Sequence, residues 1–310
     1  PGFFTINAMA YNRDRGLVDA FGGRKDLEDG VIRCVGAAEE RFTEDALRIL
    51  RAIRFPPSLG LKLRSIRKMP SKKIAPNLVH VSRERVQVEL TKLLISPLPG
   101  RIRQVYETGI SPWVSETFHR IPEISGGSCF HIPSSVPAEK SLRWAVFMRK
   151  CEPKEAVLVL KALKLDNDTI YRVKTLVQWI KVSLCGEPTE DSIQSDKDGA
   201  AIQAGYLKKE LSKHNDRIKT GLRRAMSRME PELFDDLLRV KLCLAEECPP
   251  AAECLRALCS LRDEIRRDGD CISLKMLAVT GNDLIKAGMK PGKRLEPGCS
   301  SFWNWCWRIR

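Results

Sequence analysis

The residues with the clearest chemical pattern lie in the stretch RFTEDALRILRAIRF, residues 41–55. Side chains three positions apart on a helix are neighbours. One ridge of such a helix carries a carboxylate followed by three guanidinium groups: Asp45, Arg48, Arg51 and Arg54. Three arginines on one ridge repel one another without an anionic partner, so the ridge is a candidate anion site. The alternative is an exposed face of ordinary ion pairs, each worth roughly a few tenths of a kcal/mol.

A carboxylate beside a guanidinium matches the pairing edge of two nucleic-acid bases. Cytosine and adenine present an amino donor beside a ring-nitrogen acceptor, whereas guanine and uracil present a carbonyl and an N–H. We therefore predict that Asp45 and Arg48 accept CTP and ATP and reject GTP and UTP. Glu44, beside Asp45 in the first turn, is included in the site. Arg51 and Arg54 are predicted to contact phosphate.

The elements that hold these residues are predicted to be helices. One helix is expected to begin with Thr43 as its N-cap and to end at Pro56 and Pro57. Another, over residues 82–95, begins with Ser82 as its N-cap and carries an apolar stripe. Further helices are predicted at residues 101–107, 139–149, 154–163, 167–181, 200–208, 217–226, 231–244 and 251–267.

Ahead of the helices, residues 1–36 have the pattern of the end of a mixed α/β unit. Residues 17–19 and 31–35 are rich in β-branched residues and are separated by a Gly-Gly turn. A polar linker is predicted at residues 192–199. The expected fold class is mostly α, with a helical neck, body and tail following a small β-containing remnant.

Composition narrows the class of protein further. The chain has 310 residues, 43% of them hydrophobic, and a formal net charge of +14, which favours a polyanionic partner such as nucleic acid. No apolar run is long enough for a membrane span, and the start has no signal-peptide pattern. Eleven scattered cysteines predict reduced thiols in the cytoplasm rather than disulfides. The histidines and cysteines lack metal-ligand spacing.

Taken together, the motifs resemble those of a bacterial-type CCA-adding enzyme, a tRNA nucleotidyltransferase of the poly(A) polymerase-like group. The segments that carry the resemblance, in the order of the family, are FTINAMAYN at 4–12, LVDAFGGRKDLEDGVIRCVG at 17–36, RFTEDALRILRAIRF at 41–55, VSRERVQVELTKLL at 81–94 and SLKMLAVTGNDLIKAGMKPGK at 273–293. They extend over almost the whole chain, and their combination is far more specific than any one of them.

The resemblance implies an activity and a domain order. The implied activity is addition of C, C and A to tRNA 3′-ends from CTP and ATP, with Mg²⁺ as cofactor. The implied domains are the end of the nucleotidyltransferase head at residues 1–36, a neck with the templating helix at 37–97, a helical body at 98–191 and a tRNA-binding tail at 192–310. The oligomeric state is not implied.

The resemblance also implies roles for individual residues. Asp45 and Arg48 fall on the family's templating pair, Arg51 and Arg54 on further nucleotide-binding arginines, and Asn7 in its flexible-loop motif. The turn after this motif contains Asp19, Gly22, Gly23 and Asp26. These residues are candidates for a structural role at least as much as for ligand binding. The expected RNA contacts are Arg85, Lys92, Lys286, Lys290 and Lys293.

The sequence departs from the family pattern in three places. The family's metal-binding carboxylates and Gly-Ser phosphate loop lie upstream of residue 1, so we expect an N-terminally truncated chain that is inactive alone. Gly2 stands where the family has a nucleotide-contacting arginine. Residues 56–73 and 294–310 match poorly, and a two-base shift of the reading frame gives helix-like segments similar to the family's, so we hypothesise frameshifts there.

The alternative functions are a catalytically inactive RNA-binding fragment and a poly(A) polymerase.

Overall fold

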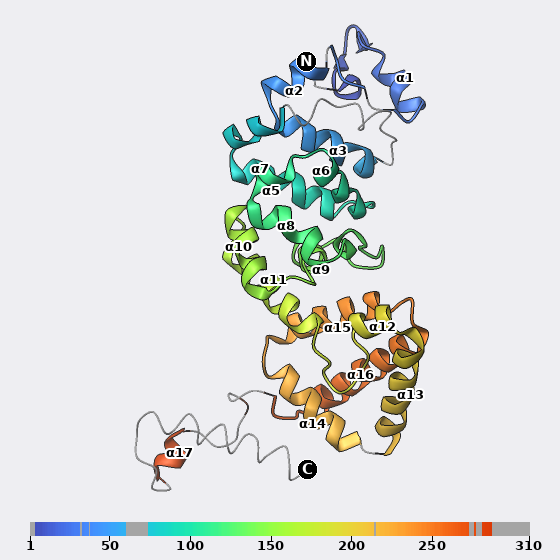
Figure 1. Cartoon of the computed structure of the whole chain (residues 1–310), viewed down its shortest axis with the longest axis vertical. Helices are drawn as coiled ribbons and strands as arrows, with labels where there is room; N and C mark the ends of the chain where they lie inside the picture. Colours follow the sequence, from blue (N-terminus) through green and yellow to red (C-terminus); the bar gives the residue numbers. More distant parts are fainter. Residues whose placement is uncertain are drawn as a thin grey trace. The chain divides into compact units, whose positions relative to one another are not determined.

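A computed structural model of the chain describes residues 4–31, 33–36, 38–59, 74–213, 215–272, 276 and 281–286. The chain divides into two compact units, Pro1–Gln178 and Trp179–Arg310, which are described separately (Figure 1). Gly2 and most of the two segments with suspected frameshifts, residues 60–73 and 294–310, lie outside the described residues.

The N-terminal unit begins with a small mixed segment. A 3-10 helix, η1 (Thr5–Asn7), precedes a two-stranded antiparallel hairpin of β1 (Ala10–Asn12) and β2 (Gly16–Val18), in which Ala10 lies opposite Val18. The short helix α1 (Gly23–Glu28) follows. In the β-branched-rich run at residues 31–35, Val31 and Cys34 are bridge residues, and Cys34 pairs with Phe4.

Asp19 determines where α1 begins. Its carboxylate accepts hydrogen bonds from the backbone N–H groups of Gly23 at 2.8 Å and Arg24 at 2.9 Å, which are the donors that a helix start leaves unsatisfied. These N–H groups, that of Arg24 foremost, hold the pKa of Asp19 below its ordinary value. The predicted Gly-Gly turn is therefore the capped start of a helix.

A buried acid ties α1 to the neighbouring segments. Asp26, which is 5% exposed, accepts a hydrogen bond from the Thr5 hydroxyl at 2.5 Å and another from Arg33 Nε at 2.9 Å. Gly23 lies directly against the backbone carbonyl of Thr5, where any Cβ would come within 2.3 Å of the oxygen. Within the structure, these residues of the turn have structural roles.

The rest of the first unit is helical. In chain order its elements are α2 (Ala38–Glu44), α3 (Leu47–Leu59), η3 (Ala75–His80), α5 (Arg83–Leu94), η4 (Pro99–Ile102), α6 (Arg103–Glu107), α7 (Ser111–Val114), α8 (Glu116–Ile124), η5 (Ser128–Phe130), α9 (Lys140–Phe147), α10 (Pro153–Ala162) and α11 (Asn167–Ile180), the last of which continues into the second unit. Helix α3 packs along α5. Trp144 of α9 is fully buried, and its indole N–H donates to the Thr91 hydroxyl of α5 at 3.0 Å.

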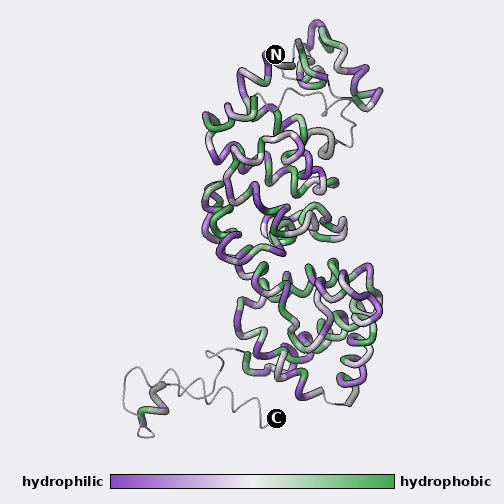
Figure 2. The backbone as a smooth tube through the Cα atoms, in the orientation of Figure 1, coloured by the Kyte–Doolittle hydropathy of each residue, from purple (hydrophilic) through white to green (hydrophobic). Residues whose placement is uncertain are grey.

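The second unit consists of helices around a core of its own. They are α12 (Glu190–Ser195), α13 (Lys197–Lys213), α14 (Asn215–Met226), α15 (Pro231–Leu244), α16 (Pro249–Arg267) and α17 (Gly281–Lys286). Along the helices of both units, hydrophobic residues alternate with hydrophilic ones, as expected for amphipathic helices around a core (Figure 2). The thiols of Cys243, Cys248 and Cys254 are buried.

The predicted start and end of the helix at residues 43–57 and the predicted linker at 192–199 are wrong, and side-chain capping explains the start and the linker. The helix expected from Thr43 is interrupted, because Thr43 belongs to α2 and the chain leaves the helical path at Asp45; α3 then runs past Pro56. Apart from Asp196, residues 192–199 are helical rather than a linker. Thr189 caps α12, where its hydroxyl accepts from the Ser192 N–H and its own N–H donates to the Ser192 hydroxyl.

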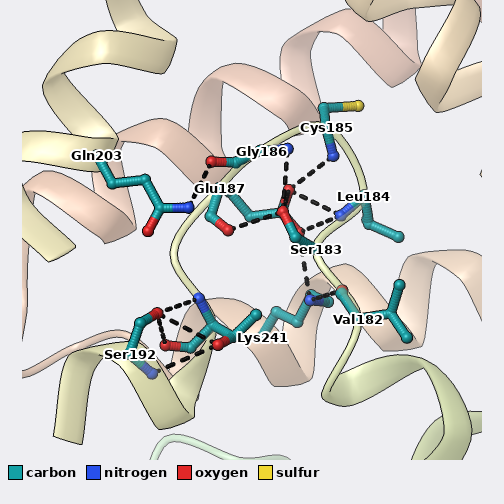
Figure 3. Close-up of polar contacts among 10 residues, drawn as sticks. Val182, Ser183, Leu184, Cys185, Gly186, Glu187, Ser192, Gln203 and Lys241 are labelled. Carbon is teal, nitrogen blue, oxygen red and sulfur yellow. Dashed lines mark hydrogen bonds and ion pairs between the residues drawn. The ribbon is translucent and has the colours of Figure 1, made fainter. Parts of the chain in front are cut away.

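The loop between α11 and α12 is organised by one fully buried acid. Glu187 accepts hydrogen bonds from the backbone N–H groups of Leu184 and Cys185, both at 2.8 Å (Figure 3). Lys241 of α15 reaches into the same loop, donating to the Val182 carbonyl at 2.6 Å and to Glu187 at 3.2 Å. Burial lowers the pKa of Lys241, and the carboxylate opposes that effect.

Within the described part of the chain, every helix is too short or too polar to traverse a bilayer. The same residues contain no group of three or more His, Cys, Asp and Glu side chains placed to bind a metal ion.

The contact of Gly23 with Thr5 gives a test of the N-terminal segment. Gly23→Ala places a methyl group against a backbone carbonyl, which cannot move aside as a side chain can, so we expect a loss of about 2 kcal/mol in the free energy of unfolding. The matched control is Gly205→Ala in α13, where a Cβ meets nothing within 4 Å. Urea unfolding followed by circular dichroism measures both; equal stability of the two variants would contradict the tight contact.

Candidate nucleotide and RNA-binding site

Asp45 lies at the junction of α2 and α3 and is held at both carboxylate oxygens. Its Oδ1 accepts a hydrogen bond from the Leu47 N–H at 3.0 Å, which caps the start of α3. Its Oδ2 accepts from Arg85 Nη2, on α5, at 2.8 Å. The side chain is 22% exposed. The carboxylate therefore has a fixed orientation and keeps some access to solvent.

Arg48 is held by different partners from those of Asp45. Its Nη1 donates to Glu44 Oε2 at 2.5 Å and to the Arg41 backbone carbonyl at 2.7 Å. The Arg48 guanidinium, followed by that of Arg41, lowers the pKa of Glu44 below its ordinary value. Asp45 and Arg48 thus lie on the same turn of the chain, each positioned by a residue outside the pair.

The other two arginines of the ridge meet a buried carboxylate. Glu89 of α5 is 5% exposed and accepts a hydrogen bond from Arg51 Nε at 3.1 Å and from Arg54 Nε at 2.5 Å. Arg54 is itself only 12% exposed, whereas Arg51 is 40% exposed. The anionic partner that the arginine ridge requires is supplied, at least for these two residues, from within the chain.

Together these contacts form a charged seam between α3 and α5, which we define by the pairs Asp45–Arg85, Arg51–Glu89 and Arg54–Glu89. Arg85 and Glu89 are four residues apart on α5 and therefore lie on one face of that helix. The seam fixes the rotation of α3 about its own axis. It leaves Asp45 and Arg48 at the start of α3 with partly exposed polar edges.

The remaining site residues lie in other places. Asn7 ends η1, and its backbone N–H donates to the Phe4 carbonyl at 2.9 Å. Lys92 is exposed in the last turn of α5, seven residues and thus two turns beyond Arg85. Lys286 is exposed at the end of α17, in the second unit. The structure brings together the α2, α3 and α5 residues of the candidate set; Lys290 and Lys293 lie outside the described residues.

Sequence reasoning missed Glu89 and Arg41. Glu89 stands within the apolar stripe of α5, between Val86 and Leu90, at a position that faces the core. A carboxylate at such a position must find cationic partners, because a buried unpaired charge is very unfavourable. That rule, applied to the stripe, would have directed attention to the arginine ridge. Arg41 contributes its backbone carbonyl, for which the sequence holds no signal.

Two family models match the chain within its first unit. The model described as the poly A polymerase head domain matches residues 3–33. The model described as a probable RNA- and SrmB-binding site of polymerase A matches residues 67–118, which include α5 with Arg85, Glu89 and Lys92. The chain thus contains a segment similar to a poly A polymerase head, followed by a segment similar to an RNA-binding site of polymerase A.

Curated relatives are similar to the chain over nearly its whole length. The CCA-adding enzyme of Geobacillus kaustophilus is 29% identical over 305 residues, which cover 97% of this chain and 65% of that enzyme. The enzyme of Lacticaseibacillus paracasei is 30% identical over 293 residues, covering 93% of this chain and 61% of the relative. That of Leuconostoc mesenteroides is 49% identical over 92 residues, covering 30% of this chain and 23% of the relative. The chain therefore spans less than two thirds of the length of these relatives.

Solved structures agree on the fold. The Bacillus stearothermophilus CCA-adding enzyme in complex with CTP superimposes with a TM-score of 0.67 at 23% identity, covering 97% of this chain and 67% of that structure. A further CCA-adding enzyme structure with CTP gives a TM-score of 0.51 at 20% identity, covering 100% of this chain and 67% of its own. The chain is therefore similar to CCA-adding enzymes, and the predicted mostly α fold is confirmed.

The seam predicts a sharp difference between two acids on α5. Glu89→Gln removes the charge that two arginines share in a buried position, so we expect a loss of about 3 kcal/mol in the free energy of unfolding. Glu84→Gln, on the same helix, breaks only an exposed pair with Lys164 and should leave the unfolding midpoint unchanged. Urea titrations of both variants measure the difference, and similar midpoints would show that the seam does not stabilise the fold.

Proposed function

We propose that the chain serves tRNA 3′-terminal CCA addition, contributing base selection and RNA binding to nucleotidyl transfer from CTP and ATP. The observation that carries the proposal is the arrangement at the start of α3, where Asp45 is oriented by Arg85 and Arg48 by Glu44. Both side chains are thus held by named partners on one turn of the chain, and each keeps partial exposure. Curated proteins similar to this chain bear the name CCA-adding enzyme.

The chemistry of base selection follows from hydrogen-bond capacity. A carboxylate has about four acceptor positions, and the Leu47 N–H and Arg85 use two of those on Asp45. Asp45 can therefore accept from the exocyclic amino group of cytosine or adenine, while Arg48 donates to the adjacent ring nitrogen. Guanine and uracil present a carbonyl to the carboxylate and an N–H to the guanidinium, which leaves both sites unpaired.

Phosphate and RNA contacts are proposed for the exposed cations around the seam. Arg51 is half-exposed and lies two turns along α3 from Asp45, a position suited to the triphosphate. Arg85 and Lys92 lie on one face of α5, within the segment that matches an RNA-binding family model. Asn7 is proposed to lie behind the nucleotide. In the second unit, Lys286, Lys290 and Lys293 are proposed contacts to the RNA backbone, which position it without reading its sequence.

The described residues do not form a site for the Mg²⁺ ion that the resemblance implies. Mg²⁺ in nucleotidyl transfer needs a set of carboxylate oxygens, and the described residues offer no such cluster. The acids of the candidate site, Asp45 and Glu89, are engaged by guanidinium groups. We therefore assign no step of metal chemistry to these residues, and we expect the chain alone to bind nucleotide and RNA without catalysing transfer.

Two alternative functions, a poly(A) polymerase and a catalytically inactive RNA-binding fragment, have observable consequences. The family model for a poly A polymerase head makes a poly(A) polymerase the second candidate. Incubation of the chain with Mg²⁺, labelled ATP and CTP, and either tRNA lacking its CCA end or generic RNA separates CCA addition, poly(A) synthesis and binding without catalysis. Addition of C, C and A contradicts the expected inactivity, and long A tracts on generic RNA identify a poly(A) polymerase. Binding without incorporation is the result that we expect.

Base selection can be measured without catalysis. We expect the wild-type chain to bind CTP and ATP more tightly than UTP and GTP, and Asp45→Ala to reduce that preference at least tenfold, because the amino group of the correct base loses its acceptor. Isothermal titration with the four triphosphates measures it. Asp168→Ala, at an exposed acid of α11, is the control. An unchanged preference in the Asp45 variant would remove the templating role.

The RNA contact at Lys92 predicts a salt effect. Lys92→Gln removes one phosphate contact, so we expect weaker tRNA binding and a slope of log K against log salt that is smaller by about one. Lys161→Gln, at an exposed lysine of α10, is the matched control and should leave the slope unchanged. Fluorescence anisotropy between low and physiological salt gives both slopes; identical slopes would place the RNA elsewhere.

A further inference from the structure

The β1–β2 hairpin of the first unit is uncovered within the described part of the chain. Every residue of β1 is exposed, and in β2 the side chains of Leu17 and Val18 are 52% and 46% exposed. Tyr11, directly opposite Leu17 and therefore on the same face, is 77% exposed. A two-stranded hairpin is only marginally stable in water, and further strands or a packed helix normally support it. The hairpin thus has the character of an incomplete sheet.

The segment after the hairpin adds to its exposed apolar side chains. Phe21, ahead of α1, and Leu27, within it, are 42% and 43% exposed. We call Tyr11, Leu17, Val18, Phe21 and Leu27 the hairpin surface. Clusters of exposed large apolar side chains commonly mark interaction sites. We propose that the hairpin surface docks a separate polypeptide that extends the sheet and carries metal-binding carboxylates for nucleotidyl transfer, an inference that rests on the proposed function.

The length of the relatives indicates what this polypeptide is. The chain covers 65% and 61% of two CCA-adding enzymes to which it is similar, and the head-domain model matches its residues 3–33. The described residues contain no cluster of acids placed to bind a metal ion, whereas nucleotidyl transfer needs one. A polypeptide with the rest of a nucleotidyltransferase head would supply both the missing carboxylates and a cover for the hairpin surface.

Backbone chemistry favours a polypeptide over a lipid surface as the occupant. Among the described residues, β1 pairs with β2 and with no other strand, so each strand has an outer edge with N–H and C=O groups. An added strand pairs with such groups, whereas hydrocarbon leaves them unsatisfied. In the turn of the hairpin, exposed Arg13 and Arg15 flank Asp14 and leave one net positive charge. That charge suits a partner rich in carboxylates.

The hairpin surface lies beside a preformed base. Asp26 of α1 accepts hydrogen bonds from the Thr5 hydroxyl at 2.5 Å and from Arg33 Nε at 2.9 Å. Gly23 lies against the backbone carbonyl of Thr5. Helix α1 and η1 are thus already joined without the partner, which lowers the cost of ordering when the partner binds.

Refolding the chain together with a head segment tests the docking. The probe is the part of the Geobacillus kaustophilus enzyme that precedes its region of similarity to this chain. Diluted together from urea, the full chain and the probe should co-elute in equal amounts from a size-exclusion column. The double variant Tyr11→Asp/Leu17→Asp should weaken the complex at least tenfold, because it places charge on the docked face. The matched control, Leu158→Asp/Tyr171→Asp, changes the same residue types at exposed positions of α10 and α11 and should leave the complex intact. Circular dichroism verifies that both variants are folded.

The outcomes separate the docking from the proposed function. Co-elution that depends on Tyr11 and Leu17, with Mg²⁺-dependent addition of C, C and A to tRNA lacking its CCA end, supports both. Such co-elution without addition supports the docking and contradicts the proposed function. A probe that precipitates or elutes alone contradicts the docking, as does a double variant that binds like the wild type; a preference of the chain for CTP and ATP would then still support the proposed function. Binding to phosphatidylglycerol vesicles that the double variant abolishes would assign the surface to lipid and overturn the proposal.

Discussion

The buried carboxylate of Glu89 is the constraint on which the candidate site depends. At 5% exposure a carboxylate requires cationic partners, and Arg51 and Arg54 of α3 supply them. Their contact turns one face of α3 toward α5 and determines which residues face outward at the start of the helix. Arg85, one turn before Glu89, extends the same contact to Asp45. The base contact proposed for Asp45 thus relies on two ion pairs further along α3, Arg51–Glu89 and Arg54–Glu89, which fix how that helix packs.

The same principle recurs elsewhere in the chain. Asp26 joins η1, α1 and Arg33 in the first unit, and Asp270 receives two hydrogen bonds from Arg223 in the second, at 2.9 and 2.5 Å. In each case a buried acid joins segments that are distant in sequence. Such groups add little net stability compared with apolar side chains, but an arrangement that separates the partners is strongly disfavoured. Each of these acids therefore constrains how its segments pack.

Helices with regularly spaced apolar residues were predictable from the sequence. The places where a side chain takes a backbone N–H and so sets the end of a helix were not. The helix α15 (Pro231–Leu244) was expected at its observed bounds, because a proline opens it and its apolar residues recur at helical spacing. Around Asp45 the helical pattern is equally regular, yet the aspartate side chain takes the Leu47 N–H and ends one helix before the next begins. Residues 192–199 are polar enough for a linker, but the Thr189–Ser192 capping box favours a helix. The ridge of arginines was visible in the sequence, whereas its partner Glu89, 38 residues from Arg51, was not.

The Glu187–Lys241 contact has a consequence for how the polypeptide is made. The two residues are 54 positions apart, and the loop at 182–187 needs both of them. During synthesis the loop leaves the ribosome long before α15 does, so the Glu187 carboxylate is at first solvated by water. The first unit can fold while the second is still being translated, because chains fold domain by domain from the N-terminus. The loop of the second unit must wait until the ribosome has passed Lys241, which makes its closure a late step in the biosynthesis of the chain.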